Sequence, residues 1–259
     1  MEPRARTTAL STNETRAYIG TSGYSYKHWK NVLYPSGLAT SRWLEFYSRT
    51  FNSVELNVTF YRLPKRQTFE TWKEQTPPHF RFVIKGSRYI THLRRLLQSA
   101  EALDNFFTNA AGLGKKLICV LWQLPPSMKM NIQRLDDFLH VLKEKYGWCR
   151  HSFEFRNPSW FTPQTYECLT RYDASLCIAD SPRASTPVHT SATFLYLRFH
   201  GGRVLYGSEY SRQELAAWAT NAARWMRGKT VLFAFFNNDA QGFAVKNAQM
   251  FKELINEKL

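Results

Sequence analysis

Short runs of the 259-residue chain place charged side chains on one face of an expected strand and apolar side chains on the other. Successive side chains of an extended strand point to opposite faces. In the segment 152–156, Glu154 and Arg156 therefore share one face, and Phe153 and Phe155 share the other. A buried charge needs a partner or a ligand. A carboxylate and a guanidinium at the end of such a strand therefore indicate an ion pair or a site.

The same alternation occurs at 53–57 and 194–200, and the apolar run 81–85 ends in a cation. Carboxylate, guanidinium, imidazole and ammonium groups are the usual means of moving protons and binding anions. These segments contribute Glu55 and Asn57; Tyr196, Arg198 and His200; and Lys85.

Eight strand-like segments alternate with helical stretches along most of the chain, which favours a parallel sheet. Eight such units in about 250 residues are typical of a (β/α)₈ barrel. The fold class predicted is α/β, a single TIM barrel with some irregular loops after its strands. The expected strands are 18–22, 53–57, 81–85, 116–122, 152–156, 175–179, 194–200 and 231–236.

Local signals predict where several helices begin. Asn131, Thr162 followed by Pro163, and the pair Ser211 and Glu214 have the pattern of helix N-caps. The segments 57–64 and 181–192 are expected to be loops. No linker divides the chain, so we expect one domain over 18–259, preceded by a flexible polar tail over 1–17.

The composition favours an anionic partner. Thirty-five basic residues against 20 acidic ones give a net charge of +15. Nucleic acid, or a phosphorylated small molecule, is the expected substrate class. A basic surface that serves only solubility is the alternative.

The sequence carries no targeting or membrane signal. No run reaches the roughly 18 apolar residues of a membrane span, and 1–17 lack the apolar segment of a secretory signal. Four cysteines without a C-x-x-C pair favour reduced, buried thiols. We expect a cytoplasmic protein with no membrane partner, and the sequence has no signal for an oligomeric state.

In a TIM barrel the active site lies at the C-terminal ends of the strands. Almost every expected strand delivers a polar side chain there. In chain order these are Ser22, Glu55 with Asn57, Lys85, Gln123, Glu154 with Arg156, Asp180, Arg198 with His200, and Asn237 with Asn238.

Three interpretations of this ring remain open. In the first, the cations Lys85, Arg156 and Arg198 hold a phosphate or other oxyanion. Glu154 or Glu55 is then the general acid or base, and His200 a second acid or base.

In the second interpretation, a divalent metal is held by Glu154, Asp180 and His200 and activates water. The spacing of these residues matches no metal motif and two arginines lie beside the carboxylates, so no cofactor is predicted. In the third, the charges pair with one another, for instance Glu154 with Arg198, and are structural.

Loops that interleave aromatic and basic residues add to the anionic-substrate interpretation, because such surfaces stack bases and neutralise phosphates. They are 24–29, 60–62 and 88–95. The candidate substrate contacts besides the three cations are Tyr24, Trp29, Asn57, Tyr61, His92, Gln123, Asp180, Tyr196, Asn237 and Asn238.

The chain resembles the YecE-like family, also catalogued as domain of unknown function 72. The resemblance spans roughly 18–255. It is carried by 20–29 (GTSGYSYKHW), 54–57 (VELN) with 59–64 (TFYRLP), 90–92 (ITH), 123–126 (QLPP), 154–156 (EFR), 196–201 (YLRFHG), 236–238 (FNN) and 247–248 (NA). Tyr24 stands where the family pattern has tryptophan. The resemblance implies a TIM barrel and supplies no reaction, because the family's activity is not established.

These observations lead to a hypothesis of a hydrolase that cleaves a phosphoester or related bond in nucleic acid or a nucleotide at the C-terminal rim. A non-catalytic nucleic-acid-binding barrel is one alternative. An enzyme that acts on a sugar or sugar phosphate, with Glu55 and Glu154 as its acid and base, is the other.

Overall fold

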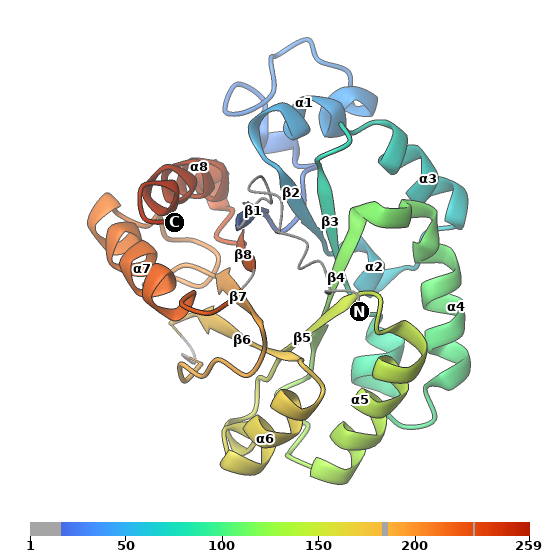
Figure 1. The fold of residues 1–259 in the computed structure, drawn as a ribbon. Helices are drawn as coiled ribbons and strands as arrows, with labels where there is room; N and C mark the ends of the chain where they lie inside the picture. Colours follow the sequence, from blue (N-terminus) through green and yellow to red (C-terminus); the bar gives the residue numbers. More distant parts are fainter. Residues whose placement is uncertain (1–16, 183–185, 230) are drawn as a thin grey trace, which may run out of the picture.

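A computed structural model describes residues 17–182, 186–229 and 231–259, and it confirms the predicted barrel. Eight parallel strands form one sheet in the order β1-β8-β7-β6-β5-β4-β3-β2, with helices on its outside (Figure 1). The strands are β1 Ala17–Thr21, β2 Ser53–Leu56, β3 Arg81–Lys85, β4 Leu117–Gln123, β5 Arg150–Glu154, β6 Ser175–Asp180, β7 Phe194–Phe199 and β8 Val231–Phe236. The predicted tail, 1–17, lies outside the described residues except for Ala17, which begins β1.

At the seam, where the first strand β1 meets β2 and the barrel closes, side-chain contacts replace most of the backbone hydrogen bonds between strands. The Asn52 amide accepts from Ile19 N at 3.0 Å and donates to Ala17 O at 2.8 Å. A Cβ atom at Gly20 would lie 2.0 Å from Ser53 O, so only glycine permits this approach. One bridge, between Ser22 and Glu55, continues the sheet across the seam at the rim.

The helices follow the predicted alternation. They are α1 Trp43–Thr50, α2 Val58–Tyr61, α3 Arg66–Glu74, α4 Ala100–Ala110, α5 Ile132–Tyr146, α6 Pro163–Arg171, α7 Arg212–Trp225 and α8 Phe243–Asn256. All three predicted caps are confirmed: the side chains of Asn131, Thr162 and Ser211 each accept from a backbone N–H of the first turn. No α-helix lies between β6 and β7 in the described part of that interval. None of the helices in the described ranges is long and apolar enough to cross a membrane.

The interval 57–64, predicted to be a loop, contains the short helix α2. Its residues are β-branched or aromatic and have modest helix propensity, so no local pattern indicates a helix there. Tertiary contacts hold the turn: Thr59 Oγ1 donates to Leu56 O at 3.0 Å and to Lys85 O at 2.6 Å. A second unpredicted turn, the π-helical segment Tyr89–Leu93, follows β3.

The barrel interior has an apolar lower half and a charged rim. Val83, Cys119, Cys177 and Phe233 are among the residues that fill the lower half. The outward-facing residues of β2, β5 and β7 pack on the helices, as their alternation predicts; they include Val54, Leu56, Phe153, Leu195, Leu197 and Phe199. The polar faces of β2, β5 and β7 therefore point into the barrel.

Candidate active site at the barrel rim

Arg198 lies at the centre of a buried charge network inside the rim. It is 1% exposed, and its two terminal nitrogens donate to different carboxylates. One bond joins Nη1 to Glu154 Oε2 at 2.5 Å, and the other joins Nη2 to Glu55 Oε1 at 2.6 Å. Burial alone would lower the pKa of Arg198, but Glu55 and Glu154 outweigh it and raise this pKa well above its usual value. Arg198 thus links three strands as a permanent cation.

The Glu55 half of the network is saturated by protein donors. Ser22 Oγ donates to Oε1 at 2.6 Å, beside the Arg198 bond. Tyr196 OH donates to Oε2 at 2.6 Å. Glu55 and Tyr196 are both 0% exposed. A carboxylate with both oxygens bonded in this way is held in one orientation.

The Glu154 half opens toward the rim. Its Oε1 pairs with Arg156, whose side chain is 18% exposed. This oxygen nevertheless accepts no well-aligned hydrogen bond from the described residues. Burial raises the pKa of the Glu154 carboxyl, but Arg198 and Arg156 outweigh burial and hold the pKa well below its usual range. Glu154 is therefore ionised near neutral pH.

His200 lies against the open half of the network. Its Nε2 is 3.4 Å from Glu154 Oε1 and 3.1 Å from an Arg156 nitrogen, and its Nδ1 is 3.2 Å from the Asn237 amide nitrogen. Burial lowers the pKa of His200 to about 4. The imidazole is consequently neutral at physiological pH, the state in which it can accept a proton.

Lys85 differs from the other cations of the rim. It is 8% exposed, and its side-chain amine forms no hydrogen bond or ion pair with any described residue. Its Nζ lies 4.2 Å from the centre of the Phe60 ring. Burial, and next the charge of Arg198, lower the pKa of Lys85 to about 8. Near neutral pH the side chain is thus mainly a cation without a carboxylate partner.

Several predicted site residues belong to structural networks around the rim. Tyr210 OH donates to Asp180 Oδ2 at 2.7 Å, and Gly201 N donates to Tyr210 OH at 3.0 Å. Asn238 is buried, and its amide donates to Ser208 O and to Asn247 Oδ1. These contacts fix the loops after β6, β7 and β8.

Trp29 is fully buried, although it was predicted to contact substrate. Its indole Nε1 donates to Asp239 Oδ1 at 2.7 Å, and His28 Nε2 lies 2.9 Å from the other oxygen of that carboxylate. Trp29 therefore links the loop that follows β1 to the loop that follows β8. Tyr24 is half-buried behind it and packs on Tyr47.

The remaining predicted contacts stay accessible. Tyr61 is 78% exposed, while Asn57, His92 and Gln123 are half-buried. The rings of His92 and Phe60 meet edge to face, with 4.9 Å between their centres. Burial, with Lys85 and Arg88 nearby, lowers the pKa of His92 to about 4. A ring cluster thus borders Lys85 on the open side of the rim.

The three residues of the hypothetical metal site do not gather. Glu154 lies beside His200, whereas the Asp180 carboxylate is bonded to Tyr210. Within 17–182, 186–229 and 231–259, no group of three or more His, Cys, Asp or Glu side chains is placed to hold a metal ion. The groups around the Glu154 carboxylate are two arginines and one imidazole, which fit an anion better than a metal cation.

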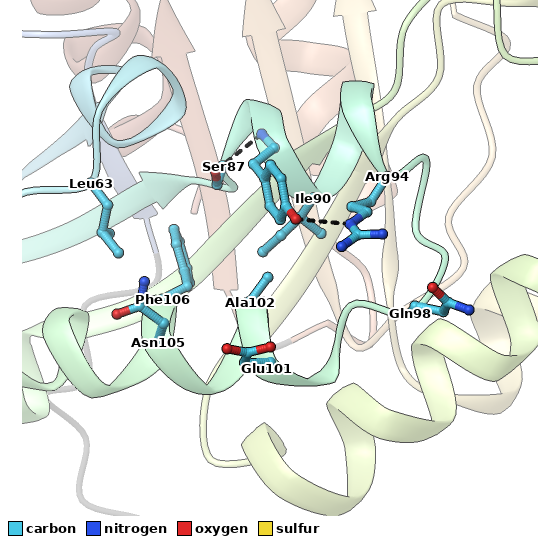
Figure 2. Close-up of a pocket in the computed structure, with 10 residues that line it drawn as sticks. Leu63, Ser87, Ile90, Arg94, Gln98, Glu101, Ala102, Asn105 and Phe106 are labelled. Carbon is cyan, nitrogen blue, oxygen red and sulfur yellow. Dashed lines mark hydrogen bonds between the residues drawn. The ribbon is translucent and has the colours of Figure 1, made fainter.

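A pocket of about 340 Å³ lies beside the rim, between the loop after β3 and α4 (Figure 2). Its lining includes Ser87, which follows Lys85 by two positions in the chain. Ile90, Ala102 and Phe106 give it apolar walls. Its polar lining is Ser87, Tyr89, Arg94, Gln98, Glu101 and Asn105. Arg94 Nε donates to Tyr89 OH at 2.9 Å, which holds the guanidinium at the pocket's edge.

Sequence reasoning missed the residues that position the site from outside it. Phe60 carries the Lys85 ammonium, while Tyr210, Asn247 and Asp239 anchor the loops. The sequence marks Phe60 by an aromatic run and the motif 59–64, and Asn247 by the motif 247–248, but neither motif indicates a contact. For Tyr210, Asn247 and Asp239, the partner is distant in the chain, so no local pattern reveals the contact.

Comparison with known proteins agrees with this fold. Residues 18–259 match the profile of the family described as "Protein of unknown function DUF72". The UPF0759 protein YunF of Bacillus subtilis is 28% identical over 270 residues, which cover 92% of this chain and 94% of YunF. The UPF0759 protein YecE of Escherichia coli K12 is 31% identical over 144 residues, covering 56% of this chain and 50% of YecE.

Solved structures extend the comparison. The crystal structure of a DUF72 family protein from Thermotoga maritima superposes with a TM-score of 0.82 at 31% sequence identity. The match covers 93% of this chain and 100% of that protein. A DUF72 family protein from Enterococcus faecalis, 21% identical with a TM-score of 0.79, has the same fold and covers 93% of this chain and 95% of its own. The predicted family resemblance is confirmed, and the chain belongs to the DUF72 family.

Proposed function

We propose that the rim is the active site of an enzyme that hydrolyses a phosphoester in a nucleic acid or nucleotide. The observation that carries this proposal is a charge imbalance. Two buried carboxylates, Glu55 and Glu154, are matched by Arg198 and Arg156. Lys85 then remains as a cation without a partner among the described residues. A buried cation is stabilised by an anion, and a phosphate would supply one.

Under this proposal each group has a role. Lys85 and Arg156 hold the phosphate, because both reach the open side of the rim. Arg198, enclosed by two carboxylates, acts as a positioning residue for Glu154. The neutral His200 imidazole accepts the proton of the attacking water, and the ionised Glu154 stabilises the resulting imidazolium.

The surroundings favour a nucleic acid or nucleotide as the bearer of the phosphate. Tyr61 and Tyr89 expose 78% and 45% of their surface, and Arg62 and Arg88 are exposed beside them. Exposed rings interleaved with cations stack bases and track a phosphate backbone. The pocket beside the rim is within the usual size range of ligand sites, about 300–1,000 Å³. The net charge of +15 adds attraction at long range.

The sugar-hydrolase alternative fits the site less well. A glycosidase of the usual two-carboxylate type needs one carboxyl group protonated as its acid. Two arginines hold the pKa of Glu154 well below its usual range, and both oxygens of Glu55 are already bonded. Neither carboxylate is arranged as a proton donor.

The test is cleavage of end-labelled single- and double-stranded DNA and RNA by the pure protein, with Mg²⁺, Mn²⁺ or EDTA. We expect cleavage that Arg156→Gln reduces strongly. Arg171→Gln is the matched control, because it removes the same charge from an exposed ion pair at the far end of α6. Salt-sensitive retardation of every probe without cleavage would instead establish a binding protein. The absence of both cleavage and retardation would overturn the proposal.

A further inference from the structure

Lys85 is the only buried lysine among the residues that the structure describes, and its amine lacks the backbone partners of several half-buried lysines. Lys116, Lys229 and Lys252 are also drawn into the protein, and each donates to a backbone carbonyl oxygen. Lys85 Nζ instead rests on the face of Phe60, 4.2 Å from the ring centre, with no hydrogen bond to a described residue. Its free donor positions therefore remain available to a ligand.

The position of this amine favours attack on a ligand. Lys85 is the last residue of β3, at the end of the barrel where TIM-barrel enzymes act. It is buried against an apolar ring, and the charges of Arg198 and Arg156 act on it. Burial and these cations favour the neutral amine and outweigh the opposing charges of Glu154 and Glu55, so the pKa of Lys85 falls to about 8. Desolvation and neighbouring cations are the means by which proteins activate lysine as a nucleophile.

We propose that Lys85 forms an imine with an aldehyde or ketone whose anionic group is held by Arg156. The proposal goes beyond the hydrolysis proposed above and rests on it only for the anion-binding role of Arg156. The reacting class is a small carbonyl compound that carries a phosphate or carboxylate.

The step is balanced without any further reagent. The Nζ lone pair forms a bond to the carbonyl carbon, while the π electrons of the C=O bond move to oxygen, which takes up a proton. Nitrogen then loses its proton, the C–O bond breaks, and the oxygen leaves as water after taking a second proton. Amine and carbonyl compound thus yield imine and water.

The probe that tests this is pyridoxal 5′-phosphate, an aldehyde with a phosphate group. The 259-residue chain is incubated at pH 7.5 with a limiting amount of pyridoxal 5′-phosphate. The imine is then reduced with borohydride, and the modified lysines are quantified by peptide mass spectrometry. We expect Lys85 to be modified about tenfold faster than an exposed lysine, since its lowered pKa leaves far more neutral amine. Lys143 on α5 is the internal reference, because it is exposed at the opposite end of the barrel.

Three further measurements separate imine formation from simple charge attraction. The modification rate of Lys85 should level off above about pH 8, whereas that of the exposed Lys143 should still be rising there. Lys85→Arg should abolish the adduct but retain sulfate binding, and Arg156→Gln should slow the modification of Lys85.

Modification of Lys85 no faster than that of Lys143 would overturn the proposal, and this result needs no variant that must fold. An unchanged rate in Arg156→Gln would overturn the role of the anionic group. No nucleic acid is present in the experiment. Its failure is therefore distinguishable from a failure of the proposed phosphoester hydrolysis.

Discussion

Two carboxylates share Arg198, and they differ in how completely the protein satisfies them. Glu55 receives bonds from Ser22, Tyr196 and Arg198, so every oxygen is committed. Glu154 receives one well-aligned bond from Arg198, and its other oxygen faces a partly exposed arginine. The closed half fixes geometry, whereas the open half can exchange partners with a ligand. Chemistry is therefore expected at Glu154 and stability at Glu55.

The largest effect should come from removing the cation that the two halves share. Arg198→Met leaves Glu55 and Glu154 buried side by side without their common partner. Breaking a buried pair typically costs about 3–5 kcal/mol, and here two pairs are broken. We expect the free energy of unfolding, measured by urea titration at pH 7, to fall by at least that amount. A fall below about 1 kcal/mol, as for an exposed pair, would contradict the view that the network fixes the barrel.

Acid should destabilise the open half through His200. Its folded-state pKa of about 4 lies below the unfolded value of about 6.5. The unfolded chain therefore binds the proton first, and stability falls as the pH drops from 6.5 toward 4. The full loss from this group is about 3 kcal/mol, from about 1.4 kcal/mol for each pKa unit.

Unfolding free energies of wild type and His200→Asn between pH 4 and 7 measure this contribution. We expect the variant to lose less stability over that interval. His151 is a second buried histidine whose pKa burial lowers to about 4, and it lies outside the rim network. It remains in the His200→Asn variant, so the difference between the two curves reports His200 alone. Parallel curves for wild type and His200→Asn would show that His200 is not the group responsible.

Much of the architecture could be predicted because it depends on local periodicity. The alternation around Glu154 and Arg198 has a period of two, so it fixes which side chains enter the barrel once the strands are recognised. Helix caps such as Asn131 and Ser211 are equally local. The ring of candidate residues followed from the fold, because parallel strands end at one rim.

The partners within that ring could not be predicted in the same way. Which carboxylate Arg198 binds depends on barrel closure, which brings together residues more than forty positions apart. The loop 20–29 shows the same limit. Its aromatic composition suggested an accessible surface, but Asp239, contributed by the loop after β8, draws Trp29 into the interior. Nor does a sequence pattern distinguish Lys85, left without a partner, from a lysine in an ion pair.

A smaller effect on stability should accompany a larger effect on binding at Arg156. Its side chain is 18% exposed, so Arg156→Gln loses an ion pair at the edge of the network rather than at its centre. We expect the unfolding free energy to fall by about 1–2 kcal/mol. Sulfate binding, measured by calorimetry, should weaken about tenfold or more, since charge-assisted bonds contribute about 1.5–3 kcal/mol. Equal losses in Arg156→Gln and in the exposed control Arg171→Gln would remove the distinction between the open and closed halves.

The finest test of the open half is the pH dependence of anion binding at Lys85. Sulfate is the suitable probe, because its charge does not change between pH 6 and 10. The Lys85 ammonium loses its proton as the pH rises through about 8, so sulfate affinity should fall across that value. In Lys85→Arg the cation persists, because a guanidinium stays protonated to about pH 12, and the affinity should stay level. A wild-type affinity that is flat through pH 8 would mean that the unpaired ammonium does not contact the anion, and the open half would then bind through Arg156 alone.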